Sequence, residues 1–597
     1  MRELILTGIK ELWPMDETRA IFLGPWCFAS NHKFKFWDQD RFTLAPSLWG
    51  TQQDVLNASL YIDSLIDRIM PSLSRLMNNF HKVDYSERFW KIYSIVWLSQ
   101  WLGVCYDRYQ RLNYLQKITD EKLTVKILDN RKCFVKDGAD YSKKITEGHY
   151  YNLLLMSDII RNGKFNFLVP QVSDISEDNI DKEKENDIQE SVKGHCFRTV
   201  LLEKIKLLVK TRIIPFKNCF PVYLGTIYGL SILDTCYLGF YYAPLAIFTR
   251  KTTSKLPPIE GDRSNFINYH LDFTAENEFE EIVKEIILQH VPETFFTLHP
   301  PLEASNSKIM AWIGNDIYSS EKNAFRIAEI CERGGLWISS QIGGGFGQTL
   351  SFPFAKIDYQ TSDGFITWGW NYNHVYPAKI YPLPSPLLSK LGKHRQKNDT
   401  LIFVSTSQPS YYYRLLSILP EQLLEYMSNQ IAFLRELSNK IRTKIKYKPA
   451  LYEFGTESRA FINKVIPWGQ FMLGGMLTNE MQKCKLIVVD HVATTSLQAF
   501  AMNAPIILFW NPAHFALTPQ AVPYFDKLRS AGILFDNPQD AAKKVNEIWH
   551  DVQGWWQQPE VQNAKDEFCH QFARTSKNWR KEWSEFLKQL NRKQLNG

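Results

Sequence analysis

The first third of the chain carries apolar residues at helical spacing. Leucine and isoleucine recur every three or four positions over residues 56–76, which predicts a long amphipathic helix. Residues 89–115 repeat this pattern with a second apolar set. Ahead of both, the apolar run 20–23 ends at Gly24-Pro25, as a strand followed by a turn does. We therefore expect a largely helical N-terminal portion over about residues 50–160.

From about residue 305 onward, short apolar runs alternate with helical periods. The predicted strands are 308–313, 336–340, 364–368, 401–405, 445–448, 485–489 and 505–509, and the predicted helices are 319–332, 421–440 and 496–502. This alternation predicts an α/β fold with parallel sheets covered by helices. The tail, residues 541–590, has the amphipathic pattern of helices.

The chain of 597 residues exceeds the size of one hydrophobic core, so we expect at least two domains. Its N-terminal part, 1–380, contains a polar, flexible insertion at about 172–194 and an α/β core at about 215–380. The Pro-rich and basic segment 381–399 is interpreted as the linker to a second α/β domain, 400–597. Two Rossmann-like domains facing a cleft resemble the GT-B architecture. We expect the acceptor on the N-terminal side, the nucleotide donor on the C-terminal side, and the active site between their facing loops.

Composition narrows the possible partners and location. The net charge is +7, but no stripe of Lys and Arg predicts nucleic-acid binding. Nine cysteines without a CxxC pair argue against a disulfide framework or a zinc site. The long apolar run 220–248 is interrupted by Asp234 and is interpreted as a strand (222–228) and a helix (232–241) rather than a membrane span. Because the first residues do not form a signal peptide, we expect a cytoplasmic protein, with peripheral contact with the inner membrane left open.

The strongest local signal for ligand binding is the segment 485–510. An apolar strand ends at Asp490, and three hydroxyl residues, Thr494, Thr495 and Ser496, open the next helix, which also carries Gln498. Free N–H groups at a helix N-terminus bind phosphate well, so these residues are candidates for contact with the donor. The alternative is that the hydroxyls only cap the helix.

The same segment resembles the nucleotide-sugar-binding segment of GT-B glycosyltransferases. Further blocks resemble an uncharacterised family of bacterial surface-carbohydrate transferases, related to capsule and teichoic-acid transferases. These blocks are LGPWC (23–27), VDYSERFWKI (83–92), DRY (107–109), QIGGGFG (341–347), SDGFITWGW (362–370), VSTSQ (404–408) and YR (413–414). In that family the glycine loop usually reads Gln-His-Gly-Gly, and Ile342 stands here in place of the histidine. The resemblance implies transfer of a sugar from a nucleotide-activated donor to an O-antigen-like or capsule-like acceptor that is a glycan or a lipid-linked glycan.

Such a transfer needs a group that takes the acceptor proton and cations that hold the leaving phosphate. Candidates for the catalytic residues are Asp358, Asp363, His491 and Gln341, with His32 as a further possible base. Asp363 could instead cap a turn, and His491 could be a satisfied loop histidine. Lys448 follows a strand and Arg414 suits bidentate phosphate contact, so both are candidates for donor binding, although either could be solvated.

We expect no cofactor and no metal. The Asp38-Gln-Asp40 triplet matches a metal-binding pattern, but it lies outside the α/β part of the chain. The glycine loop is no P-loop, because no Gly-Lys-Ser/Thr follows it. Two alternatives remain open at this point: transfer of a polyol phosphate from a CDP-linked donor, and a catalytically silent scaffold, which the departure at Ile342 motivates.

Overall fold

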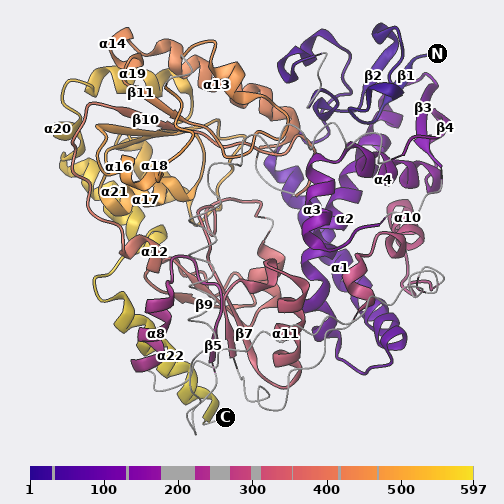
Figure 1. The fold of residues 1–597 in the computed structure, drawn as a ribbon, viewed down its shortest axis with the longest axis horizontal. Coiled ribbons are helices and arrows are strands. Elements are labelled where there is room, and N and C mark those ends of the chain that lie inside the picture. The colour runs from indigo at the N-terminus through magenta and orange to yellow at the C-terminus, as the bar shows by residue number, and fades with distance from the viewer. Residues whose placement is uncertain are drawn as a thin grey trace.

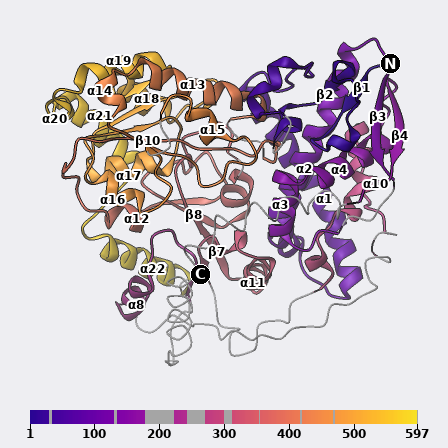
Figure 2. The ribbon, with the colours of Figure 1, turned by 45° about the horizontal axis from the view of Figure 1, so that its top comes forward.

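The computed structural model describes residues 1–29, 34–129, 134–176, 222–241, 266, 269–297, 311–352, 354–414, 418–466 and 470–595. Within them, three sheets form, and every strand pair in them is parallel. Figure 1 shows the N-terminal sheet at the right, the C-terminal sheet at the upper left and the third below them. Figure 2 shows the same three groups of elements from a second direction.

The N-terminal sheet has the order β2-β1-β3-β4. Its strands are β1 (Glu3–Ile5), β2 (Ala20–Phe22), β3 (Leu123–Leu128) and β4 (Leu168–Ser173), and its helices are α1 (Gln52–His81), α2 (Glu87–Ile118), α3 (Gly138–Glu147) and α4 (His149–Asn162). The two long helices and β2 confirm the sequence predictions. A helical N-terminal portion was an incomplete prediction, because β1, β3 and β4 make a sheet there. These strands are short or carry Lys, Thr, Pro and Gln, so their apolar pattern is weak.

The middle sheet runs in chain order, β5-β6-β7-β8-β9. Its strands are β5 (Val222–Leu224), β6 (Ala311–Ile313), β7 (Leu336–Ser340), β8 (Gly364–Thr367) and β9 (Lys379–Pro382). Helix α11 (Glu321–Glu332) is capped by Ser320 and packs against α2, which joins this sheet to the N-terminal part. Helix α8 (Ile232–Tyr241) and strand β7 have the predicted bounds. No described helix is long and apolar enough to cross a membrane.

The C-terminal sheet has the order β11-β10-β12-β13-β14. Its strands are β10 (Leu401–Val404), β11 (Ile445–Lys448), β12 (Leu486–Val489), β13 (Ile506–Phe509) and β14 (Leu534–Phe535). Helices α13 (Leu423–Glu436), α14 (Asn439–Arg442) and α19 (Pro538–Ile548) lie on one face, and α16 (Leu477–Met481), α17 (Thr494–Met502), α18 (Val522–Ser530) and α21 (Pro559–Phe572) lie on the other (Figure 1). Because the chain leaves β10 outward to β11 and then returns to β12 on the other side, a topological switch point lies between β10 and β12.

The last helix, α22 (Trp579–Leu595), returns to the middle sheet and packs beside α8. Trp583 donates its indole N–H to the carbonyl of Pro384 at 2.9 Å, and Arg580 is paired with the buried Asp234. The predicted helical tail is therefore present, but its end covers the opposite half of the molecule. The segment interpreted as a linker contains α12 (Pro386–Ser389), and its residue His394 donates a backbone hydrogen bond to Met502. Of the predicted insertion 172–194, residues from 177 onward lie outside the described residues.

Candidate functional site

Loops from the carboxyl ends of the middle and C-terminal sheets touch each other. The Gly344 N–H donates to the Thr494 hydroxyl at 2.9 Å, and the Leu350 N–H donates to the carbonyl of Ala516 at 2.8 Å. An antiparallel bridge joins Thr349 to Leu517. The two sets of loops therefore face each other, as the sequence predicts, and the facing edges are where parallel α/β sheets bind ligands.

The glycine loop after β7 is shaped by Gln341 and by the absence of side chains. The buried Gln341 donates to the Gly343 carbonyl at 2.8 Å and accepts from the Trp368 N–H and the Trp370 indole. A Cβ on Gly344 would lie 2.5 Å from the carbonyl carbon of Ala493, so only glycine allows this approach to α17. Gln341 thus holds the loop through all three of these bonds, and the half-buried Ile342 packs on the C-terminal core.

The four candidate donor residues on α17 differ in their contacts. Thr494 accepts from Gly344, and the Ser496 hydroxyl donates to the Ala493 carbonyl at 2.7 Å. Thr495 and Gln498 are half-buried, and within the described part of the chain their side chains have no hydrogen-bond partner. The N-cap residue of the helix, Ala493, contributes no side-chain cap. The hydroxyls therefore do not satisfy the first N–H groups of α17 in the way that a capping residue would.

A buried Asp–His pair lies at the switch point, directly after β12. Asp490 is 1% exposed and accepts from the Tyr426 hydroxyl at 2.8 Å and from the Gln430 amide at 2.7 Å. Its Oδ1 is 2.9 Å from the Nδ1 of His491. A carboxylate in this position holds an imidazole with Nδ1 protonated, which leaves Nε2 able to accept a proton.

A cavity of about 770 Å³ lies where the three sheet-bearing parts meet. It is walled by α1 and α2 and by segments that follow strands of all three sheets. These segments are α3 after β3, 317–321 after β6, Phe352, Phe354, Lys356 and Ile357 after β7, Arg414 after β10, and Tyr452 and Phe454 after β11. Its charged lining includes Asp63, Lys356 and Arg414. Aromatic rings such as Tyr318, Phe352 and Phe354 supply apolar faces between these charges.

Asp358 lies behind this cavity, on a π-helical turn that spans Lys356–Thr361. The carboxyl is fully buried, and burial raises its pKa to about 7, although hydrogen bonds from Ser339 and Tyr318 favour ionisation. The Tyr318 hydroxyl donates to Asp358 Oδ2 at 3.1 Å, and Tyr318 is itself a residue of the cavity wall. Asp358 thus has no direct access to the cavity, and its contact with the cavity wall runs through Tyr318. Turns of this kind are frequent at functional sites.

The remaining candidates are spread over the molecule. Asp363 precedes β8, accepts the Trp337 N–H at the start of β7 and pairs with Arg88 at 2.6 Å, so it lies at the amino-terminal edge of the sheet, away from the facing loops. Lys448 ends β11 and donates to the Met472 carbonyl at 3.2 Å. The Arg414 guanidinium stacks over the rings of Phe354 and Tyr413, each at 4.8 Å. His32 lies outside the described residues.

Asp63 and Lys356 are among the polar residues of the cavity that sequence reasoning does not predict. Asp63 is a carboxylate inside the apolar period of α1, four residues before Asp67, and this placement was the available signal. Lys356 is 5% exposed, and only the packing of the π-helical turn against α1 and α2 reveals that it lines the cavity. Among the described residues, no three His, Cys, Asp or Glu side chains gather as metal ligands, and Asp38 accepts the Lys35 N–H.

A family model described as LIC12162 family transferase matches residues 2–587. The chain belongs to the LIC12162 family of transferases. No curated protein matches it. The blocks that carried the resemblance to surface-carbohydrate transferases are separate in the sequence of this LIC12162 family transferase, and three pairs of them meet in space.

The first pair is the glycine loop and the TWGW segment, which Gln341 joins. The second is the SERFWK and SDG segments, which meet in the Arg88–Asp363 ion pair. The third is LGPWC with DRY: Trp26 stacks under the guanidinium group of Arg108 at 5.7 Å, and under that of Arg111, two positions after the DRY block, at 4.8 Å. In this chain, contacts between blocks that are distant in sequence therefore hold these segments together.

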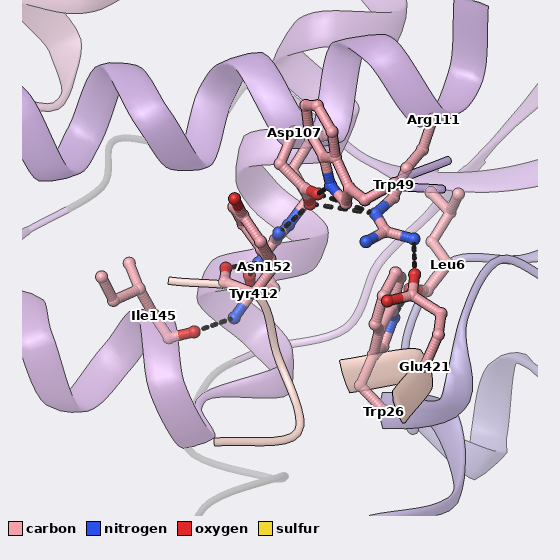
Figure 3. Close-up of polar contacts among 10 residues, drawn as sticks. Leu6, Trp26, Trp49, Asp107, Arg111, Ile145, Asn152, Tyr412 and Glu421 are labelled. Atoms are coloured by element: carbon pink, nitrogen blue, oxygen red, sulfur yellow. Dashed lines mark hydrogen bonds and ion pairs between the residues drawn. The ribbon is translucent and has the colours of Figure 1, made fainter. Parts of the chain in front are cut away.

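The DRY block of the transferase forms a buried charge network, which Figure 3 shows. Asp107 is fully buried between Arg108 and Arg111, and it also accepts the Trp49 indole N–H at 2.7 Å. Arg111 pairs in addition with Glu421 of the C-terminal part. Burial works against the ionised form of Asp107, but Arg111 and Arg108 outweigh it and keep its pKa below the usual range.

This network fixes the segment that carries Arg414. Arg108 donates to the carbonyl of Tyr412 at 2.9 Å, and the neighbouring Tyr411 stacks on Trp26 and hydrogen-bonds to His149 at 2.7 Å. The residues just after β10 are therefore anchored in the N-terminal part of the transferase. Arg414, two positions further on than Tyr412, is held at the cavity by this anchor.

Proposed function

We propose that this transferase moves a sugar from a nucleotide-activated donor to a bacterial surface-polysaccharide acceptor, with a GT-B arrangement of its middle and C-terminal sheets. One observation carries the proposal: carboxyl-end loops of two parallel sheets meet beside a cavity of about 770 Å³ that holds both carboxylate and guanidinium groups. Enzymes that join two substrates need such a space between two ligand-binding edges. A cytoplasmic location would give access to nucleotide-activated donors.

The donor nucleotide is proposed to lie at the switch point between β10 and β12. The N-terminus of α17 faces the middle sheet through the Gly344–Thr494 contact and has N–H groups that no side chain caps. These N–H groups, with Thr495 and Gln498, suit a pyrophosphate. Arg414 offers a guanidinium that pairs with no carboxylate among the described residues, and Lys448 adds a positive charge at the end of β11.

The acceptor glycan is proposed to enter the cavity between the helices of the N-terminal part and the π-helical turn. Aromatic faces at Tyr318, Phe352 and Phe354 suit the apolar faces of sugar rings. His491, oriented by Asp490, remains a candidate for proton transfer near the donor. Asp358 is proposed to position Tyr318, whereas Gln341 and Asp363 are proposed to hold the loop and the sheet.

A lipid-linked acceptor would bring the protein to the inner membrane. Exposed apolar side chains lie on two segments beside the edge strand β11: Leu451, Tyr452, Leu473 and Met476. Lys446 and Lys483 line a hollow on the second of these segments. Exposed apolar groups beside basic groups favour peripheral contact with an anionic bilayer. Co-sedimentation with anionic vesicles, lost in a Leu451→Ser, Leu473→Ser variant, tests this contact.

The test of the proposed function is release of free nucleotide from a panel of nucleotide sugars, with CDP-linked polyols included. Turnover of a nucleotide sugar, with an acceptor product heavier by one glycosyl residue, is the expected result. A product heavier by a polyol phosphate would show instead that the donor is a CDP-linked polyol. Neither binding nor turnover of any donor would favour a catalytically silent scaffold.

A further inference from the structure

Two aspartates one turn apart on α1, Asp63 and Asp67, face different surroundings. Asp67 accepts from Lys91 at 2.7 Å and from Lys356 at 2.8 Å. Asp63 lines the cavity, and its hydrogen-bond partner is the neutral amide of Gln360 at 3.3 Å. Lys91 and Lys356 are thus both bonded to Asp67, which does not line the cavity.

Because Asp63 and Asp67 have different hydrogen-bond partners, their pKa values move in opposite directions. Burial raises the pKa of Asp63 to about 6, against the smaller opposite effects of Lys356 and Gln360. Burial also disfavours ionisation of Asp67, but hydrogen bonds from Lys356 and Lys91 outweigh it and hold the pKa of Asp67 below the usual range. Two nearby carboxyls whose surroundings push their pKa values apart are the arrangement from which enzymes build acid–base pairs.

We propose that Asp63 is the catalytic base of the transfer, and that Arg414, which lines the same cavity, holds the leaving phosphate. This inference rests on the proposed function. In the step, the acceptor oxygen bonds to the anomeric carbon of the donor while its proton moves to the Asp63 carboxylate. The bond from the anomeric carbon to the phosphate oxygen breaks, and its electron pair leaves with the nucleotide, whose charge the guanidinium neutralises.

Position and surroundings favour Asp63 over the fully buried Asp358 as the base. Asp63 lines the cavity itself, whereas Asp358 contacts it only through Tyr318. A base with a pKa about one unit below neutral is largely ionised at pH 7 and still basic enough to take a proton. Lys91 and Lys356 donate their hydrogen bonds to Asp67. They therefore act on the neighbouring Asp63 as charges and not as hydrogen-bond donors.

The first test compares Asp63→Asn with Asp358→Asn and with the surface control Asp272→Asn, whose side chain is 97% exposed. With a donor that the wild type turns over, Asp63→Asn is expected to lose about 100-fold or more in kcat while the donor Kd stays within about threefold. The acidic limb of the wild-type pH profile, with a midpoint near the pKa of Asp63, should disappear in Asp63→Asn and persist in Asp272→Asn. A loss in Asp358→Asn that exceeds the loss in Asp63→Asn, or an unchanged acidic limb, would overturn the assignment and leave the proposed function standing.

A second test needs no turnover and therefore separates the two proposals. Wild-type protein is treated at pH 6 with a water-soluble carbodiimide and glycine ethyl ester, and labelled peptides are read by mass spectrometry. Carbodiimides react with the protonated acid, so Asp63 should be labelled faster than Asp67, although the Asp67 side chain is 51% exposed. Faster labelling of Asp67 would refute a protonatable Asp63 in the cavity. If Asp63 is labelled as expected but no donor binds, the proposed function fails on its own.

Discussion

Replacing Gly344 by alanine tests the contact between the two ligand-binding edges. The new Cβ would lie 2.5 Å from the carbonyl carbon, 2.7 Å from the carbonyl oxygen of Ala493 and 2.8 Å from the Thr494 nitrogen, whereas real Cβ contacts stay above 3.0 Å. These are backbone atoms, so the glycine loop and α17 must move apart by about half an ångström or more. The movement also breaks the 2.9 Å bond from Gly344 to Thr494.

The expected cost follows from these two effects. Overpacking of a fitted contact costs about 1–3 kcal/mol, and the lost hydrogen bond costs roughly 1 kcal/mol more. A loss of about 2–4 kcal/mol corresponds to a fall of roughly 5–10 °C in the melting temperature of a domain of about 200 residues. Donor affinity should fall as well, because the N-terminus of α17 shifts with the loop.

The assay is thermal unfolding followed by tryptophan fluorescence, with Gly474→Ala as the matched control. A Cβ on Gly474 would meet nothing within 4 Å, so this variant should melt within about 1 °C of the wild type. Gly343→Ala should be milder than Gly344→Ala, because its new Cβ meets only the Thr494 hydroxyl, at 2.9 Å. A Gly344→Ala protein that melts like Gly474→Ala would refute the close approach of the two sheets' loops.

Four further predictions concern the network, the donor site, Asp63 and metals. Asp107→Asn should destabilise the protein by about 3–5 kcal/mol in urea unfolding, because two buried guanidinium groups lose their shared carboxylate. The control Glu121→Gln, in an exposed ion pair, should leave the unfolding midpoint nearly unchanged. Thr495→Ala should weaken nucleotide binding about 10-fold or more in calorimetry at an unchanged melting temperature, whereas a lowered melting temperature with unchanged affinity would mean a purely structural role. The pKa of Asp63 is raised from 3.8 to about 6 by burial, so stability should fall as pH rises from about 4 to 6; Asp63→Asn, which cannot ionise, should gain about 1–3 kcal/mol at pH 7.5, and an equally stable variant would contradict the burial. Turnover should survive EDTA, and a loss that Mn²⁺ or Mg²⁺ restores would show that a metal is required.

The sequence predicts most of the middle and C-terminal sheets because their strands are short apolar runs between breakers. Strand β11 and helix α8 begin and end at the predicted residues, and β12 differs by one. In the N-terminal sheet β2 was predicted, but β3 and β4 were not, because β3 carries Thr and Lys at alternate positions and β4 is mostly exposed. The return of α22 to the middle sheet is set by tertiary contacts, such as Trp583 with Pro384, that leave no periodic signal.

The sequence predicts those residues of the candidate site that come directly after a strand. Thr494 and His491 lie at the facing edge because β12 delivers them there, and Arg414 lies in the cavity wall after β10. Asp63 comes from a helix about 300 residues earlier in the chain, so only packing reveals its place beside the π-helical turn. Asp363 illustrates the opposite case: its motif is prominent in the sequence, but its contacts with Arg88 and Trp337 lie at the other edge of the sheet.

The most direct test of the central claim is a crystal structure of the protein with a nucleoside diphosphate, or with the donor identified by the turnover panel. The account predicts the pyrophosphate against the N-terminal N–H groups of α17, in the crevice between the carboxyl ends of β10 and β12, with the sugar end directed toward Arg414 and Asp63. A nucleotide bound at another edge of the molecule, or no binding at millimolar concentration, would contradict the proposed donor site and with it the assignment of sugar transfer to this cleft.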